Sequence, residues 1–353
     1  MNLLKRLRID TFLLAIAASA VIASLLPARG PAVPVFDVAT TALIAVLFFL
    51  YGARLHPEQA IAGLKHWRLH TVILAFTYVV FPLVGLAIHL VAPSLVTAAL
   101  AMGLLYLTLV PSTVQSSINF TSVAGGNVAG AVVAASASNL IGVVLTPALV
   151  LVLMGTGGLH VDPSSILDIV AQILVPFVVG QLSRRWTAGF IERHKKALKL
   201  VDQGVIVLVV YNAFSAGRRE HIWSQVSVAD LAALVGICLV LLAGMLALTW
   251  YSSGWLKFAR DDRIAIMMCG TKKSLASGLP MATVLFAGTG TPASLIVLPL
   301  MVFHQAQLMA CGAIAGRLAR GQVTAGAAAA PDSGPGSGRE PDAAGSADPA
   351  AAG

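Results

Sequence analysis

The stretch IMMCGTKKSLASGLPMATVLF, residues 266–286, sets two adjacent lysines, Lys272 and Lys273, inside an apolar run of membrane-spanning length. They are the only charged residues between Arg263 and Arg317. A lysine at the centre of a bilayer costs about 2.5–3.5 kcal/mol on insertion scales, so two together require a compensating environment. The stretch therefore indicates a membrane protein that handles polar or ionic cargo within the bilayer.

The composition of the whole chain supports a membrane location. Hydrophobic residues make up 58% of the 353 residues and charged residues 11%, whereas soluble domains carry about 25% charged residues. Ten apolar stretches approach the roughly 20 residues that a helix needs to cross the hydrocarbon: 11–28, 35–53, 69–92, 95–122, 127–154, 164–183, 200–217, 228–251, 264–286 and 292–316. Because lipid leaves every backbone polar group to be satisfied within the chain, these segments are predicted to be helices. The predicted fold is an all-α membrane protein with ten transmembrane helices.

The residue types present exclude several other classes of protein. The three cysteines, Cys238, Cys269 and Cys311, lie in different apolar stretches without a CxxC pair or a histidine at metal-ligand spacing, so neither a disulfide framework nor a metal site is predicted. No nucleophile–base pair or carboxylate pair lies in the apolar core, so neither an enzyme nor a cofactor is predicted. The net charge of +8 resides in short loops, where it indicates membrane topology and no nucleic-acid partner.

With ten spans, lysine and arginine fall mainly on one side of the membrane. One side carries Lys5, Arg6, Arg8, Arg54, Lys65, Arg68, the basic run from Arg184 to Lys199, Lys257, Arg260, Arg263, Arg317 and Arg320, and the other carries Arg29, Arg218 and Arg219. The positive-inside rule then predicts a multi-pass protein of the cell inner membrane with both termini in the cytoplasm. The amino-terminal apolar stretch is predicted to be the first span, because it lacks a small-residue cleavage site before Pro27.

The chain divides into two halves and a tail. Residues 1–156 form the first predicted repeat of five spans, residues 157–320 form the second, and residues 321–353, rich in Ala, Gly, Pro, Ser and Asp, form a disordered cytoplasmic tail. An odd number of spans in each half makes the two halves insert in opposite orientations. A weak internal repeat, with an offset of roughly 159 residues, aligns two interrupted spans, and paired interruptions are typical of a transporter's binding site. They are LVPSTVQSSINFTS at 109–122 and CGTKKSLASGLP at 269–280.

Polar side chains cluster around both interruptions. No Asp, Glu, Lys or Arg lies between Leu69 and Val161, so neutral hydroxyl and amide groups must act there. Their oxygens can replace the water around a small cation, or they can join helices through packing hydrogen bonds. The candidate substrate- or ion-binding residues are Ser112, Thr113, Gln115, Ser116, Ser117, Asn119, Asn127, Ser136 and Asn139 in the first half, and Thr271, Lys272, Lys273, Ser274, Ser277, His304, Gln305 and Gln307 in the second.

The two lysines have several interpretations that the residues leave open. An ammonium can cap the free carbonyls at the carboxyl end of a half-helix. Consecutive residues do not share a helical face, so one lysine is free to cap while the other faces a cavity. A cavity lysine could bind an anionic substrate, carry a coupling proton or take the place of a bound cation. His304, on the same face as Gln307, could shuttle protons or serve only in packing.

Five segments resemble the bile acid:sodium symporter superfamily, and most closely its SBF-like branch. They are FFLYGARL at 48–55, GLKHWRLH at 63–70, VPSTVQSSINFTSVAGGN at 110–127, GTKKSLASGLPMATVLF at 270–286 and LPLMVFHQAQLM at 298–309. The resemblance implies ten helices in two inverted five-helix repeats, arranged as a panel domain and a core domain. It also implies that helices 4 and 9 are broken and cross each other.

The sodium sites of this family carry over only in part. The resemblance likens Ser117 and Asn119 to a Ser–Asn pair that follows the first break in sodium-coupled members. Those members also carry a glutamate at the second break and a glutamine four residues later, which correspond here to Met268 and Lys272 when the glycine is matched to Gly270. An ammonium at that position repels sodium at close range.

These observations predict a secondary transporter that moves a small organic anion across the inner membrane by alternating access. The positive end of a half-helix and an ammonium both favour carboxylates. The coupling ion is left open between a proton and sodium, and the lysines argue against sodium. The alternatives are a cation/proton exchanger, which the absence of a core carboxylate argues against, and a non-transporting membrane regulator of ion homeostasis.

Overall fold

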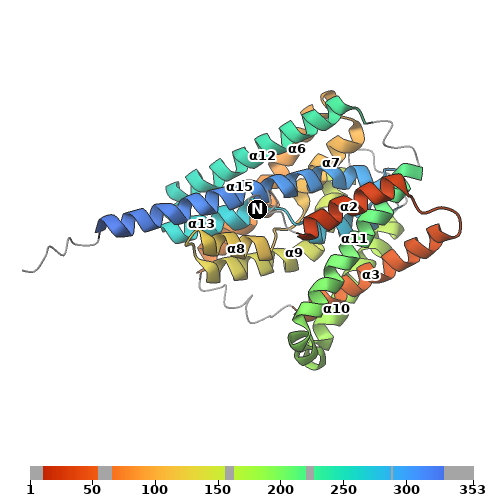
Figure 1. Ribbon diagram of the computed structural model, residues 1–353, viewed down its shortest axis with the longest axis horizontal. Helices are drawn as coiled ribbons and strands as arrows, with labels where there is room; N and C mark the ends of the chain where they lie inside the picture. Colours follow the sequence, from red (N-terminus) through yellow and green to blue (C-terminus); the bar gives the residue numbers. More distant parts are fainter. Residues whose placement is uncertain (1–10, 55–65, 156–162, 220–225, 288, 330–353) are drawn as a thin grey trace, which may run out of the picture.

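The computed structural model describes residues 11–54, 66–155, 163–219, 226–287 and 289–329 of the chain. Over these residues the regular structure is helical and contains no strand (Figure 1). This confirms the predicted all-α class. The last helix continues to Ala329, past the predicted start of the tail at residue 321, and residues 330–353 lie outside the described part.

The α-helices range from nine to 37 residues in length. In order they are α2 (Thr11–Leu25), α3 (Ala32–Arg54), α5 (Trp67–Ala75), the π-helical turn η2 (Phe76–Val80), α6 (Phe81–Val91), the 3-10 turn η3 (Ala92–Ser94), α7 (Ala98–Leu109), α8 (Gln115–Val123), α9 (Val128–Met154), α10 (Pro163–Arg193), α11 (Lys195–Arg219), α12 (Val228–Trp255), α13 (Arg260–Gly270), α14 (Leu275–Leu285) and α15 (Ala293–Ala329).

Within the described residues, six helical segments are each long and apolar enough to cross a membrane. They are Ala32–Arg54, Trp67–Ser94, Val128–Met154, Lys195–Arg219, Val228–Trp255 and Ala293–Arg320. The predicted fourth and ninth spans are each divided into two short helices, α7 with α8 and α13 with α14, so no half reaches the roughly 20 residues of a complete span. The chain is thus a multi-pass helical membrane protein, and the count of ten spans stays a prediction.

The helices form two groups. Helices α2, α3, α10 and α11 pack together at one end of the molecule, with α3 along α10 and α2 along α11 (Figure 1). We call these four the panel helices and the remaining ones the core helices. An ion pair between Arg54 and Asp202 joins α3 to α11. Among the core helices, α14 packs against both α10 and α11, so it lies at the boundary between the two groups.

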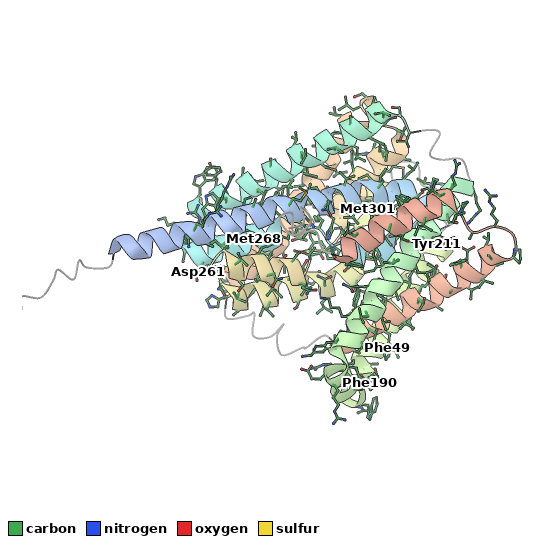
Figure 2. The ribbon with its side chains drawn as sticks, in the orientation of Figure 1. Phe49, Phe190, Tyr211, Asp261, Met268 and Met301 are labelled. Atoms are coloured by element: carbon green, nitrogen blue, oxygen red, sulfur yellow. The ribbon has the colours of Figure 1, made fainter. Side chains whose placement is uncertain are left out.

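Two glycines permit the close contact between α3 and α10. A Cβ atom on Gly52 would lie 2.0 Å from the carbonyl oxygen of Phe177, and one on Gly180 would lie 2.0 Å from the carbonyl oxygen of Phe49. Phe49 lies beside α10 where these two helices touch (Figure 2). Glycine lets membrane helices approach until their backbones touch, and here the relation is reciprocal. Helices α3 and α10 are therefore held at a backbone-to-backbone distance that any side chain at these two positions would increase.

Local sequence explains where the two divided spans are interrupted. Val110 precedes Pro111 and takes an extended conformation, with φ −77° and ψ 156°, because proline disfavours the helical region for the residue before it. Helix α7 therefore ends at Leu109. Helix α14 begins after Ser274, whose hydroxyl oxygen accepts a hydrogen bond from the backbone N–H of Ser277 at 3.2 Å. This N-cap satisfies one of the free donors at the start of the second half-helix.

Candidate functional site

The two interruptions meet inside the core helices. The backbone N–H of Ser274 donates to the carbonyl oxygen of Pro111 at 2.8 Å. The hydroxyl of Ser112 donates to the carbonyl oxygen of Cys269 at 2.6 Å, near the carboxyl end of α13. We call the two contacting segments, 110–114 and 271–274, the crossing. Segments far apart in sequence thus satisfy each other's backbone groups where the helices are broken.

The ammonium of Lys273 is fully engaged at the crossing. It donates to the carbonyl oxygens of Thr77, Thr108 and Val110 at 2.9, 2.7 and 3.0 Å. Its nitrogen also lies 4.3 Å from the centre of the Phe81 ring. An ammonium has three N–H groups, and all three are used here. Lys273 is completely buried, and its charge lies at the carboxyl end of α7, where the helix dipole is negative.

The carbonyl of Thr77 is free to accept this bond because of a local irregularity in the helix. In the π-helical turn η2, the N–H of Phe81 donates to Phe76. The residue five positions after Thr77 is Pro82, which has no N–H to offer. The turn thus leaves the Thr77 oxygen without a π-helical donor and presents it to Lys273.

Side chains from α9 hold the first segment of the crossing. The backbone N–H of Ser112 donates to the hydroxyl oxygen of Ser138 at 3.1 Å, and its carbonyl accepts from the amide of Asn139 at 2.7 Å. The Asn139 oxygen in turn accepts from the hydroxyl of Ser277 on α14 at 2.8 Å. The chain of contacts fixes the unwound backbone to both broken spans.

Gln307 on α15 holds the second segment in the same manner. Its side-chain oxygen accepts from the backbone N–H of Lys273 at 2.8 Å, and its amide donates to the Lys273 carbonyl at 2.8 Å. The Nδ1 atom of His304 lies 3.1 Å from that carbonyl oxygen and 2.8 Å from the Gln307 amide nitrogen. Each segment of the crossing is thus bound, through an N–H and a C=O, by polar side chains of the helix that follows its broken span.

The ammonium of Lys272 lies in a different environment from that of Lys273. It is completely buried and lies 4.0 Å from the centre of the Phe120 ring on α8. Within the described residues this nitrogen makes no hydrogen bond. A cation–π contact therefore replaces the hydrogen bonds that the other lysine has.

Some other predicted residues also lie at the crossing. The hydroxyl of Thr113 lies 2.7 Å from that of Ser116 and 3.0 Å from that of Ser117, so these three form a hydroxyl cluster at the start of α8. The hydroxyl of Thr271 donates to the carbonyl of Met267, within its own helix end. All of these hydrogen bonds have local partners.

Five predicted residues lie elsewhere. Asn127 caps α9 by accepting from the N–H of Gly130 at 2.8 Å, and its amide donates to Asp262 at 2.7 Å, so it joins helix ends remote from the crossing. Gln115 and Asn119 are exposed on the surface of α8, and Ser136 and Gln305 are half-buried. In the part of the chain that the structure describes, no hydrogen bond connects these last four to the crossing.

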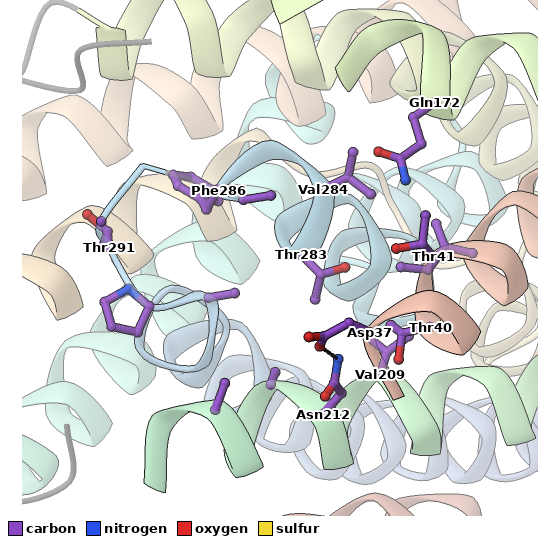
Figure 3. A pocket seen from close by; sticks show the side chains of 17 residues that line it. Asp37, Thr40, Thr41, Gln172, Val209, Asn212, Thr283, Val284, Phe286 and Thr291 are labelled. Carbon is purple, nitrogen blue, oxygen red and sulfur yellow. Dashed lines mark hydrogen bonds between the residues drawn. The ribbon is translucent and has the colours of Figure 1, made fainter. Parts of the chain in front are cut away.

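A cavity of about 740 Å³ lies where α14 meets the panel helices (Figure 3). Asp37 is the only charged side chain among the described residues that line it, and its carboxylate accepts from the amide of Asn212 at 2.9 Å. The other lining residues are Thr40, Thr41, Ile44, Gln172, Val209, Ala213, Ala216, Thr283, Val284, Phe286, Ala287, Gly290, Thr291, Pro292 and Ala293. Neither Lys272 nor Lys273 lines this cavity.

Beyond one end of the cavity, α3 and α14 come into contact. Ile44 lines the cavity, and two turns further along α3 the hydroxyl of Tyr51 donates to the carbonyl of Ala276 at 3.4 Å. Ala276 lies between Ser274 and Ser277, both of which belong to the hydrogen-bonded network of the crossing. The cavity thus occupies one part of the boundary between panel and core helices, and the contact between Tyr51 and Ala276 occupies the adjacent part.

The sequence analysis missed Asp37 as a site residue. A signal was available, because Asp37 is the only acidic residue in the apolar stretch 35–53, and an ionisable residue within a span is a functional-site hypothesis by default. The absence of a carboxylate, which argued against a cation/proton exchanger, was considered only for the core. The structure brings this panel carboxylate to the face of a core helix, which the sequence did not indicate.

Comparison with known proteins identifies the family. The model of the SBF-like CPA transporter family (DUF4137) matches residues 10–320. The chain belongs to this family. The match spans the whole helical region as far as Arg320, as the resemblance of the five segments predicted.

Relatives of this SBF-like chain carry transporter names. It is 45% identical over 315 residues to "Putative symporter YfeH" of Escherichia coli, covering 88% of this chain and 93% of that protein. It is 31% identical over 319 residues to "Sodium/bile acid cotransporter 7" of Mus musculus, covering 88% and 92%. An uncharacterized protein of Pseudomonas aeruginosa is 47% identical over 325 residues, covering 91% and 96%. The SBF-like chain therefore belongs to a family of membrane transporters and is not an enzyme, as predicted.

Proposed function

We propose that this chain is a secondary transporter of the inner membrane that moves a small organic solute by alternating access. In this proposal the chain has ten spans in two inverted repeats, with residues 1–156 and 157–320 as the halves, and both termini in the cytoplasm. The panel helices and the core helices are the two bodies that move relative to each other.

The contact between the two broken spans is the observation that carries this proposal. Broken helices tolerate unwound backbone at membrane depth only where protein or a cavity surrounds it, and transporters place such breaks at their binding sites. Here the breaks are bound to each other by the Ser274–Pro111 and Ser112–Cys269 hydrogen bonds. The clamps from α9 and from α15 follow the same pattern, which supports an inverted repeat.

Lys273 serves in this proposal as a built-in cation. Three carbonyl oxygens converge on its ammonium at 2.7 to 3.0 Å, and carbonyl oxygens are also the groups that hold small metal cations. A covalently attached ammonium cannot leave with the cargo, so the crossing keeps its charge throughout the cycle. The transporter would therefore need no sodium ion at this position.

The nature of the cargo depends on what lines the cavity. The prediction of an organic anion required a lysine in contact with the solute, and neither lysine lines the cavity. That prediction stays untested, and the cavity offers no cation among the described residues in its support. The volume of about 740 Å³ is within the range of pockets that hold small organic molecules.

Site-directed labelling tests alternating access without knowledge of the substrate. Thr41→Cys and Thr283→Cys place a thiol on each wall of the cavity, one on a panel helix and one on a core helix. The three native cysteines are buried, so the parent protein gives the background. A membrane-impermeant maleimide should label both variants in right-side-out and in inside-out vesicles, because each wall faces the two sides in turn.

The control for labelling is Thr146→Cys, which replaces a fully buried residue of α9 outside the cavity and should stay unlabelled. Labelling of the cavity cysteines from one membrane side alone would contradict alternating access and favour the non-transporting regulator.

A further inference from the structure

We infer that the cavity beside α14 binds an organic cation, with the carboxylate of Asp37 as its counter-ion. This names the substrate class of the transporter proposed above and rests on that proposal. It reverses the sign of the cargo charge that the sequence predicted. The argument comes from the charges, the unpaired polar atoms and the size of the cavity.

The charges around the cavity favour a cation. Asp37 is the only charged group among the described lining residues, and its exposed carboxylate attracts cations and repels anions. Two arginines end α11. Arg219 is directed elsewhere, because it donates to the carbonyl of Ala28 at 3.2 Å and to the hydroxyl of Ser215 at 3.1 Å, and the exposed Arg218 does not line the cavity. Lys273 is occupied by its three carbonyls at the crossing.

Two polar atoms beside the carboxylate lack partners. An ionised carboxylate only accepts hydrogen bonds, so Asn212 must direct its amide nitrogen at Asp37 and its oxygen away from it. That oxygen is buried and accepts no hydrogen bond within the described residues, and the buried hydroxyl of Thr40 also has no partner there. Thr40 lies three residues after Asp37 and thus on the same face of α3. Unpaired buried polar groups are costly. Both atoms are closed to solvent, so a ligand with N–H groups would satisfy them once these side chains rotate toward it.

The size and the remaining lining define the rest of the ligand. A volume of about 740 Å³ is larger than a metal cation or a proton requires. Ile44, Val209, Val284 and Phe286 contribute apolar surface to the walls, and such surface binds the hydrocarbon part of an organic molecule. The geometry therefore assigns to the cavity an amine in its ammonium form, with an apolar body.

Three ligands of matched shape test this inference. They are 2-phenylethylammonium, 3-phenylpropionate and 2-phenylethanol, which share a phenylethyl body and differ in the charge of the head group. Thermal unfolding of the purified full-length protein is followed while each is titrated at constant ionic strength, because a ligand that binds the folded state raises the unfolding temperature. We expect a saturable rise with the ammonium, a smaller rise with the alcohol and none with the carboxylate.

Variants assign the effect to the cavity. The dissociation constant for 2-phenylethylammonium should rise at least about tenfold in Asp37→Asn, because the charged partner is lost, and should stay near the parent value in Asp37→Glu. Asp261→Asn removes an exposed carboxylate at the start of α13 and should change nothing. If Asp37→Asn does not fold, the order of the three ligands on the parent protein still decides.

Two results would overturn the inference: a carboxylate that stabilises the parent at least as much as the ammonium does, or no saturable effect of the ammonium. An ammonium effect that survives in Asp37→Asn would also overturn it. Each result is separate from the labelling experiment, in which a failure of the transporter proposal appears as one-sided reactivity of the cavity cysteines.

Discussion

Lys272 and Lys273 are neighbours in sequence, yet their ammonium groups differ in the hydrogen bonding that decides their contribution to stability. Both are completely buried. The ammonium of Lys273 satisfies three backbone carbonyls, whereas that of Lys272 makes no hydrogen bond among the described residues and contacts the Phe120 ring. Hydrogen bonds to a buried charge offset its desolvation cost, whereas a buried charge without partners carries that cost uncompensated.

Replacement of Lys273 by methionine should destabilise the protein strongly. The variant keeps the length of the side chain but leaves the carbonyls of Thr77, Thr108 and Val110 without their donor. An unsatisfied buried acceptor costs about 1–3 kcal/mol, so we expect a large fall in the temperature of unfolding in detergent. The control is Lys195→Met, which removes an exposed lysine of a surface ion pair and should have little effect. Equal stability of the two variants would contradict the capping role.

The matching change at Lys272 should have the opposite character. Lys272→Met removes an ammonium without hydrogen bonds and loses a cation–π contact worth about 0.5–2 kcal/mol. Replacement of a buried charge by an apolar group of similar volume is often neutral or stabilising. We therefore expect the unfolding temperature to stay the same or rise. A loss as large as that of Lys273→Met would show that Lys272 has a stabilising partner after all.

At the scale of elements, the broken spans and the glycine contact between α3 and α10 have different structural roles. The breaks give up helical hydrogen bonds at Val110–Val114 and Thr271–Ser274 and recover hydrogen bonds from the other span and from α9 and α15. The panel helices, in contrast, remain continuous, and α3 and α10 touch through their backbones at Gly52 and Gly180. The core can thus form polar contacts at membrane depth while the panel stays a rigid body.

Alanine at Gly52 or Gly180 should separate α3 from α10. In each variant the new Cβ would lie 2.0 Å from a carbonyl oxygen of the facing helix, and a backbone atom cannot rotate away. Overpacking of this kind costs about 1–3 kcal/mol, which thermal unfolding would detect.

Gly189→Ala is the matched control in the same helix, because nothing lies within 4 Å of its added Cβ. It should be neutral or slightly stabilising, since alanine favours a helix over glycine by about 1 kcal/mol. Equal destabilisation at Gly180 and Gly189 would show that the close contact is not what matters.

At the scale of the whole molecule, the cavity lies between the panel helices and the core helices. The core helices contain the two buried lysines at the crossing, and the panel helices contribute Asp37 to the cavity. A motion of one body against the other would change the distance of the cargo from both. The fixed ammonium at the crossing would travel with the core and need no replacement from solution.

Exchange of sodium for potassium should therefore leave the molecule unaffected. We expect the unfolding temperature of the purified protein to be the same in the two chloride salts at equal ionic strength, because Lys273 already occupies the three carbonyls. A saturable rise with sodium alone, following the linkage between binding and stability, would instead indicate a sodium site and contradict the built-in cation.

Much of the fold class and of the candidate site could be predicted from residue types and their order. The all-α class, the interruptions around Pro111 and Gly270 and the family followed from hydropathy, helix breakers and short motifs, because each is a local property of the chain. The cluster at the crossing was also predicted in part, since Ser112, Asn139 and Gln307 all contact the broken segments. Asn127, which the sequence analysis grouped with them, caps the start of α9, because a polar residue close in sequence can lie at the far end of the helix.

Local sequence carries the membrane character of this chain, since the cost of placing a side chain in lipid depends on that side chain and its immediate neighbours. The partners of the charged groups, in contrast, do not follow from local sequence. Lys273 finds its first carbonyl 196 positions away in sequence, and Asp37 faces Asn212 at a distance of 175 positions. Only the packing of the helices decides such pairs, because contact between distant segments depends on the arrangement of the whole chain. For that reason the all-α class was predictable from hydropathy, while the contacts of the two lysines and of Asp37 emerged from the tertiary structure.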